Sequence, residues 1–162
     1  MLASSFSMHS VARLIVVGLA TLSLTGCDAS SGGTAGPAGT AGSSASRPPV
    51  FDARPYTEAK AAATAEGKWL IVKATADWCG PCKQMDKTTW RDDAVVAWCK
   101  ENAIVVALDV DQEPAVAKEL GVSGIPTTVA FQNGTTEIDR LVGMRDGPAF
   151  LAWLEGVEGS AR

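Results

Sequence analysis

The chain has 162 residues, of which 46% are hydrophobic and 20% are charged, and its formal net charge at pH 7 is -4. This acidic balance, with no concentrated basic stretch, excludes an electrostatic nucleic-acid binder. The four cysteines are too few for a small secreted fold held together by disulfides, so the globular part must depend on a hydrophobic core.

The first 26 residues have the pattern of a lipoprotein signal peptide. Arg13 supplies positive charge, and residues 14–24 form an apolar run that is too short for a comfortable transmembrane helix. The run leads into Leu-Thr-Gly-Cys at 24–27, which resembles the bacterial lipobox. We expect cleavage before Cys27 and acylation of Cys27, which places the protein at a cell membrane, facing the periplasm or the cell exterior. A plain signal peptide and an uncleaved anchor are the alternatives.

Residues 27–50 are expected to hold the lipidated Cys27 and a flexible tether. They consist almost entirely of Ala, Ser, Gly, Thr and Pro, with Asp28 and Arg47 as the charged residues. Such a segment cannot bury enough apolar surface to fold, so it serves as a linker. The remaining residues, 51–162, suit one globular domain.

Helical and strand patterns alternate along this domain. Thr57 is a candidate cap for a helix over residues 58–66 that ends at Gly67. Residues 69–75 are almost continuously apolar and rich in β-branched side chains, which is typical of a buried parallel strand. The later predicted elements are a helix from Gly80, a helix capped by Asp92 that ends near Glu101, a strand at 103–109, a helix at 114–120, strands at 127–132 and 135–142 joined by an Asn133-Gly134 turn, and a helix at 148–154. This order predicts an α/β domain with a mixed central sheet flanked by helices on both faces.

The sequence Trp78-Cys79-Gly80-Pro81-Cys82 follows the first of these strands and has the spacing of a redox dithiol. If a helix begins at Gly80, Cys79 lies at its N-terminus, where free N–H groups and the helix dipole stabilise a thiolate. Pro81 fits the first helical turn. Cys82 then lies one turn inward, shielded but able to attack a mixed disulfide formed at Cys79.

Half of a zinc site is the alternative interpretation of the two cysteines. Zinc prefers four ligands from Cys and His, but beyond the pair the domain offers only Cys99, and His9 lies in the signal segment. We therefore expect no metal and no other cofactor. Cys99 shares an apolar helix face with Val95 and Trp98, which predicts a buried and inert thiol.

Three motifs within residues 70–157 resemble the thioredoxin family. They are Ala76–Lys83 after a strand, Asp109–Asp111 at the end of the next, and Gly121–Thr127 before the predicted hairpin. The resemblance implies the thioredoxin fold and a cis peptide bond before Pro126. It also implies a substrate-binding surface formed by Trp78, Gly80, Pro81, Ile125 and Pro126, in which the backbone of Ile125 bonds an extended peptide.

Residues 88–95 break the helix after the dithiol, as in domains similar to the C-terminal domain of the thiol:disulfide interchange protein DsbD. Asp86 then matches an acidic residue near the dithiol of that group, or it is a plain exposed helix residue. Thioredoxins commonly place a buried aspartate six residues before the first cysteine, and this chain has Lys73 there. A charged Lys73 would stabilise the thiolate and make the pair more oxidising, a neutral one could act as a base, and a third possibility is that it extends to solvent.

The resemblance implies a thiol–disulfide oxidoreductase in which Cys79 attacks a substrate disulfide and Cys82 resolves the mixed disulfide. Gly80-Pro81 resembles reducing thioredoxins, so we expect a protein-disulfide reductase. A disulfide oxidase or isomerase and a non-enzymatic client-binding module are the alternatives. The expected partners are disulfide-bearing proteins, a membrane electron donor and the bilayer that holds acylated Cys27, with no nucleic acid. We expect a monomer.

Overall fold

A computed structural model describes residues 47–160 of the protein. The predicted signal peptide, Cys27, His9 and most of the linker lie outside the described residues. Within residues 47–160, no helix is both long enough and apolar enough to cross a membrane.

The domain is built on a five-stranded mixed sheet with the strand order β1-β3-β2-β4-β5. The strands are β1 (Phe51–Asp52), β2 (Trp69–Thr75), β3 (Ala103–Asp109), β4 (Thr127–Gln132) and β5 (Thr136–Val142). β3 pairs in parallel with both β1 and β2, whereas β4 is antiparallel to β2 and to β5. β2 is thus the central strand, and all its interior residues are buried, as its near-continuous apolar sequence predicts.

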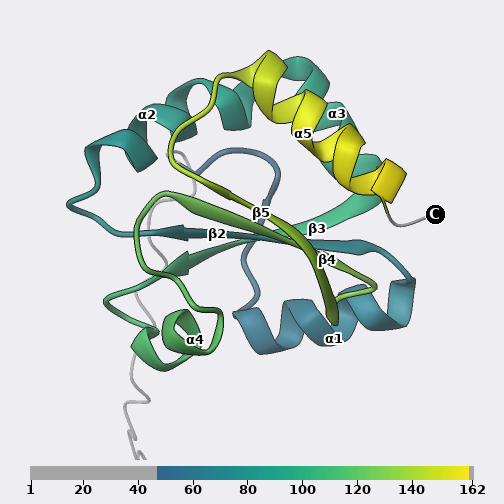
Figure 1. The fold of residues 1–162 in the computed structure, drawn as a ribbon, viewed down its shortest axis with the longest axis horizontal. Helices are drawn as coiled ribbons and strands as arrows, with labels where there is room; N and C mark the ends of the chain where they lie inside the picture. Colours follow the sequence, from purple (N-terminus) through teal and green to yellow (C-terminus); the bar gives the residue numbers. More distant parts are fainter. Residues whose placement is uncertain (1–46, 161–162) are drawn as a thin grey trace, which may run out of the picture. The chain divides into compact units, whose positions relative to one another are not determined.

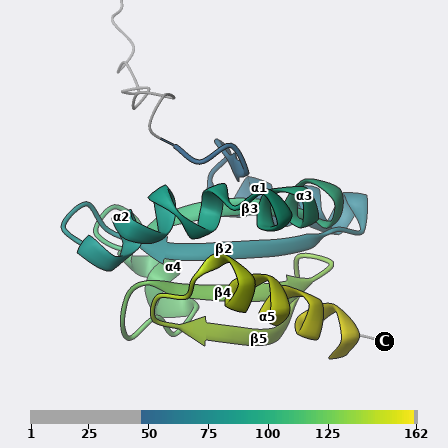
Figure 2. The same cartoon turned by 90° about the horizontal axis from the view of Figure 1, so that it is seen from above.

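Helices cover both faces of the sheet. α1 (Tyr56–Glu66) and α4 (Pro114–Glu119) lie on one face, and α2 (Gly80–Lys87), α3 (Asp93–Asn102) and α5 (Gly147–Ser160) lie on the other (Figures 1 and 2). Two buried apolar clusters correspond to these two layers, because successive side chains of each strand point to opposite faces. This arrangement confirms the predicted α/β thioredoxin fold.

The start of α1 differs from the prediction. The helix begins at Tyr56 after Pro55, and no side chain caps it, whereas Thr57 is exposed inside the first turn. Tyr56 is buried in the core, so packing draws it into the helix without a capping hydroxyl. The C-terminal end was correctly predicted, because Gly67 has a left-handed conformation with φ 64°.

Three further differences concern the other elements. β1 was not predicted, and a short 3₁₀ helix, η1 (Thr89–Arg91), separates α2 from α3. α5 extends well beyond Leu154 to Ser160 because Val157 adds to its buried face. The predicted break in the helix after the dithiol is confirmed, and Asp92 caps α3 as expected, with its Oδ1 accepting hydrogen bonds from two backbone N–H groups at 3.0 and 3.2 Å.

Candidate active site

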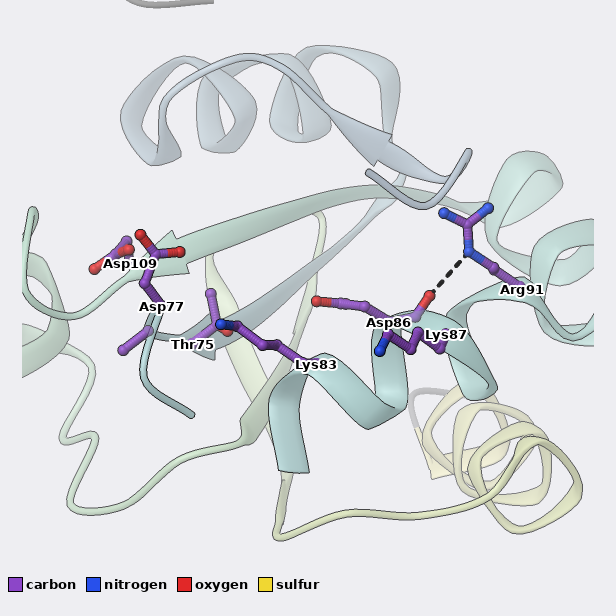
Figure 3. A pocket seen from close by; sticks show the side chains of 8 residues that line it. Thr75, Asp77, Lys83, Asp86, Lys87, Arg91 and Asp109 are labelled. Carbon is purple, nitrogen blue, oxygen red and sulfur yellow. Dashed lines mark hydrogen bonds between the residues drawn. The ribbon is translucent and has the colours of Figure 1, made fainter. Parts of the chain in front are cut away.

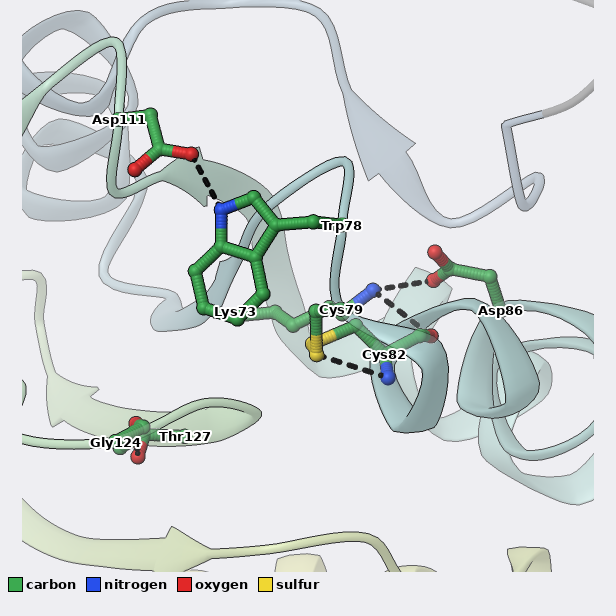
Figure 4. The surroundings of a disulfide bond; sticks show 8 residues. All are labelled: Lys73, Trp78, Cys79, Cys82, Asp86, Asp111, Gly124 and Thr127. Carbon is green, nitrogen blue, oxygen red and sulfur yellow. Dashed lines mark hydrogen bonds and ion pairs between the residues drawn. A yellow bond between two sulfur atoms is a disulfide. The ribbon is translucent and has the colours of Figure 1, made fainter.

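The Cys79–Cys82 pair lies at the start of α2, just beyond the end of the central strand β2. The two cysteines form a disulfide, and both are buried. Cys79 is the N-cap residue, and its Sγ accepts a hydrogen bond from the backbone N–H of Cys82 at 3.2 Å (Figure 4). Pro81 occupies the first turn of the helix. A sulfur in this position faces free N–H groups and the positive end of the helix dipole, which favours a thiolate when the pair is reduced.

The loop before β4 places a second motif beside the dithiol. The Ile125–Pro126 peptide bond is cis, as the resemblance implies. Ile125 packs against the buried cluster that contains both cysteines. The carbonyl of Pro126 accepts a hydrogen bond from the N–H of Gly143 at 2.8 Å, and the carbonyl of Gly124 accepts one from the hydroxyl of Thr127 at 2.6 Å. These bonds fix the loop at its position next to the disulfide.

Exposed apolar side chains lie next to these two motifs. Trp78 is 69% exposed, and its indole Nε1–H donates a hydrogen bond to Oδ2 of Asp111 at 2.7 Å (Figure 4). Val142 and Met144 are 57% and 48% exposed, and they flank Gly143, which bonds the cis-proline loop. The three side chains, Trp78, Val142 and Met144, form what we call the apolar rim of the site. The sequence indicated only Trp78, because no motif marks Val142 at the end of β5 or Met144 in the segment that follows.

Asp111 is held in place by the turn that follows β3. The carboxylate of Asp109 accepts hydrogen bonds from the backbone N–H groups of Asp111 at 2.9 Å and Gln112 at 3.3 Å. Such a bond between an aspartate side chain and the next backbone groups fixes a turn. The two aspartates of the Asp109–Asp111 motif therefore have different roles, since Asp109 fixes the turn and Asp111 orients Trp78.

Lys73 is buried on β2, with only 1% of its surface exposed. Its Nζ donates to Oδ1 of Asp86 at 2.5 Å and to the carbonyl of Cys82 at 3.5 Å, and it lies 5.6 Å from the centre of the Phe51 ring. Desolvation lowers the pKa of Lys73, and the hydrogen bond and charge of Asp86 oppose that shift. The possibility that Lys73 extends to solvent is therefore wrong, and so is the interpretation of Asp86 as a plain exposed residue.

These features, a dithiol that caps a helix after the central strand and a cis-proline loop packed against it, can be compared with known proteins. Residues 56–158 match the family model of a thioredoxin-like domain. The chain belongs to the thioredoxin-like family.

Individual relatives agree with this assignment. The thioredoxin-like chain is 35% identical to a thioredoxin of Chlamydia caviae over 82 aligned residues. The aligned region covers 51% of this chain and 76% of that protein. It is 37% identical to the protein disulfide-isomerase tigA of Aspergillus niger over 95 aligned residues. This region covers 57% of this chain but only 26% of that protein. The solution structure of a thioredoxin from Thermus thermophilus is 29% identical and superposes with a TM-score of 0.60 over 67% of this chain and 87% of that one. The Cys79–Cys82 pair in this fold is consistent with a thiol–disulfide oxidoreductase.

A cavity of about 350 Å³ opens beside α2 in this thioredoxin-like domain (Figure 3). Neither cysteine lines it, whereas the carboxylate of Asp86 does. Its lining residues are Thr75, Ala76, Asp77, Lys83, Asp86, Lys87, Arg91 and Asp109. The cavity therefore gives solvent access to Asp86, whereas the ammonium of Lys73 is buried.

Cys99 lies on the buried face of α3, away from this site. It is a free thiol, and burial raises its pKa to about 12. A thiol that stays protonated at physiological pH is a poor nucleophile, in agreement with the predicted inert role. Among the described residues, no group of three or more His, Cys, Asp or Glu side chains is placed to hold a metal ion.

Proposed function

We propose that the protein is an extracytoplasmic, membrane-tethered protein-disulfide reductase. The observation that carries the proposal is the position of Cys79 as the N-cap of α2, with Cys82 one turn inward and its N–H directed at the Cys79 sulfur. This arrangement separates an activated outer cysteine from a shielded inner one, which a two-step thiol–disulfide exchange requires.

In the first step the thiolate of Cys79 attacks one sulfur of a substrate disulfide. A mixed disulfide forms, and the other substrate sulfur leaves as a thiolate that takes up a proton. In the second step Cys82 gives up its proton and its sulfur attacks Sγ of Cys79, so that the second substrate sulfur leaves. The substrate gains two electrons and two protons, and the protein is left as the Cys79–Cys82 disulfide.

The substrate-binding surface in this proposal comprises the cis-proline loop and the apolar rim. A backbone segment of the substrate would pair with Ile125, while Trp78, Gly80, Pro81 and Pro126 contact its side chains. An exposed apolar patch next to a dithiol suits unfolded or extended polypeptides, because such chains expose apolar side chains and unpaired backbone groups.

The direction of electron flow rests on the residues between the cysteines. Gly80-Pro81 resembles reducing thioredoxins, whose potential is about -270 mV. A buried cation near the pair favours the thiolate and shifts the potential upward, which supports disulfide oxidation or isomerisation as the second candidate function.

The location rests on the sequence of the N-terminal segment. Acylation of Cys27 would anchor the protein, and the linker up to residue 50 would let the domain reach substrates and a membrane partner. Because no soluble reducing buffer is assured outside the cytoplasm, a reductase there needs an electron donor in the membrane.

The test uses the full chain in detergent with insulin as the disulfide substrate and dithiothreitol as the electron source. With dithiothreitol present, the wild-type protein should accelerate insulin reduction and Cys79→Ser should lose this activity. Reduced Cys82→Ser, mixed with insulin after dithiothreitol is removed, should accumulate a mixed disulfide at Cys79. The matched control is Cys99→Ser, which removes the buried thiol and should retain activity. Full activity in Cys79→Ser would contradict the mechanism.

A further inference from the structure

We propose that Lys73 and Asp86 act as one positioning unit for the dithiol, in which Asp86 keeps a protonated Lys73 beside Cys82 and this cation stabilises the reduced pair. The inference deepens the proposed function and rests on it in one respect, since the unit matters only if Cys79 and Cys82 cycle between thiol and disulfide. Neither residue is a catalytic residue in this account, because neither is placed in contact with the reacting sulfur atoms.

The contacts of Lys73 explain why it needs Asp86. Its strand neighbours in register are Ala107 on β3 and Thr128 on β4, and neither carries a charge. Its ammonium group reaches the carbonyl of Cys82 and the face of Phe51, which are weak partners for a buried cation compared with a carboxylate. Without a counter-charge, a buried ammonium gives up its proton. Asp86 at 2.5 Å supplies that counter-charge.

The two ends of the ion pair have different surroundings. The ammonium end is buried against the first turn of α2 through the carbonyl of Cys82, whereas the Asp86 side chain is 30% exposed and lines the cavity beside α2 (Figures 3 and 4). Water in the cavity screens the carboxylate more strongly than the ammonium. The dithiol therefore experiences the positive end of the pair more than the negative end.

The other charged groups near Asp86 face the same cavity from several elements. They are Asp77 after β2, Lys83 and Lys87 on α2, Arg91 on η1 and Asp109 at the end of β3. The first four are exposed and Asp109 is partly buried, so solvent screens their charges more strongly than that of Lys73. The buried charge closest to the first turn of α2 is that of Lys73. Removing this charge should therefore destabilise a thiolate at the dithiol more than removing a charge at the cavity surface.

A cation that stabilises thiolate stabilises the reduced pair relative to the disulfide. The relevant equilibrium is that between the reduced protein and glutathione disulfide. Cys79 and Cys82 together lose two protons and two electrons and form their disulfide, and glutathione disulfide takes them up to give two glutathione thiols. The constant of this equilibrium can be measured without a protein substrate or a membrane partner.

The experiment compares variants of the full chain in glutathione buffers. Lys73→Met should raise the fraction of protein disulfide, changing the equilibrium constant by about tenfold, which corresponds to about 30 mV. The equilibrium constant of Asp86→Asn should equal that of the wild type at low pH, where Lys73 is still protonated. At high pH it should equal that of Lys73→Met, because Lys73 without its counter-charge loses its proton within the measured pH range. The Lys73→Met/Asp86→Asn double variant should match Lys73→Met within about twofold.

The control is Lys83→Met, which removes an exposed lysine from α2, the helix that carries Cys82 and Asp86, and should change the constant by less than about twofold. The double variant has no buried cation, so it keeps the test valid if Asp86→Asn alone fails to fold. The inference is overturned if Lys73→Met leaves the equilibrium constant within about twofold of the wild type. It is also overturned if, at a high pH where Asp86→Asn alone shifts the constant, the effects of the two single variants add in the double variant.

These results separate the inference from the proposed function. A protein that reduces no insulin but shows the Lys73→Met shift would contradict the proposed function and support the ion-pair inference. An active reductase with no shift in either single variant would contradict the inference and leave the proposed function intact.

Discussion

At the scale of single residues, the buried lysine is the feature that sets this protein apart from an ordinary domain core. An ammonium group on a central strand costs free energy unless it is paired, and here the pair is made with a partly exposed carboxylate on the neighbouring helix. Replacing a buried ion pair with apolar groups is often neutral or stabilising. The Lys73–Asp86 pair is therefore weak evidence for a stabilising role, and the buried lysine is better explained by its position beside the dithiol.

Lys73→Met removes the buried ammonium and leaves the carboxylate of Asp86 unpaired. Because that side chain is 30% exposed, the variant should lower the free energy of unfolding by less than the roughly 3–5 kcal/mol that breaking a fully buried pair costs. The pKa of Lys73 is lowered in the folded state, so the unfolded chain binds more protons than the folded one between that lowered pKa and the ordinary value of 10.5. The free energy of unfolding of the wild type therefore rises with pH across this window. Below the lowered pKa, Lys73 contributes no such rise. The variant should lack this alkaline gain. Urea denaturation of both proteins across that pH range measures it, and an alkaline gain that persists in Lys73→Met would assign it to another group.

At the scale of elements, the break between α2 and α3 determines how the active-site helix ends. α3 restarts at Asp93 because the side chain of Asp92 accepts hydrogen bonds from two N–H groups of its first turn. The break leaves Trp90 fully buried between Phe51 and Phe150 in the core below α2. The cap thus supports the packing of the layer that carries the dithiol.

Asp92→Ala should lower the free energy of unfolding by about 1 kcal/mol, since it removes a cap with two acceptor bonds. Asp93→Ala is the matched control, because this exposed first-turn residue contributes only through the helix dipole, which at an exposed site in salt is worth about 0.3 kcal/mol. Urea denaturation of both variants gives the comparison. A loss in Asp93→Ala as large as that in Asp92→Ala would contradict the capping role.

The elements that the sequence predicted are those with a strong local signal. The dithiol helix was predicted from its cysteine motif with Pro81 in the first turn, β2 from its almost continuous apolar sequence, and α3 from the capping residue Asp92. β1 has two residues and no pattern, and α1 begins at Tyr56 because tertiary packing outweighs the cap that Thr57 suggested. The partner of Lys73 could not be predicted from residues 73 and 86 alone, since their contact depends on how α2 packs on the sheet.

At the scale of the whole molecule, the apolar rim and the cis-proline loop lie on one side of the dithiol, while the cavity that reaches Asp86 lies beside α2. Substrate contact and the control of potential are therefore assigned to different surfaces. A change at the rim should alter how protein substrates bind without altering the chemistry of the sulfur atoms.

Val142→Ser and Met144→Ser should each raise KM for insulin by about threefold to tenfold, since each removes an exposed apolar contact of about 1 kcal/mol. The rate with a small disulfide such as hydroxyethyl disulfide should not change, because it does not reach the rim. Steady-state kinetics with both substrates provide the test. Equal losses with both substrates would place these residues in the chemistry or the folding of the site.

The proposed tether makes a prediction for the complete chain. Cys27→Ser should abolish palmitate incorporation in a bacterial host that processes lipoproteins, because the side chain that would carry the acyl groups is removed. Cys99→Ser is the matched control and should incorporate palmitate like the wild type. Metabolic labelling with palmitate measures the modification, and unchanged labelling of Cys27→Ser would contradict acylation at this position.

The reduction potential of the Cys79–Cys82 pair in the wild-type chain tests the central claim most directly. Equilibration with dithiothreitol or glutathione buffers measures it independently of any substrate. A protein-disulfide reductase should give a value near or below about -250 mV. A value above about -180 mV would contradict the reductase assignment and favour disulfide formation or isomerisation.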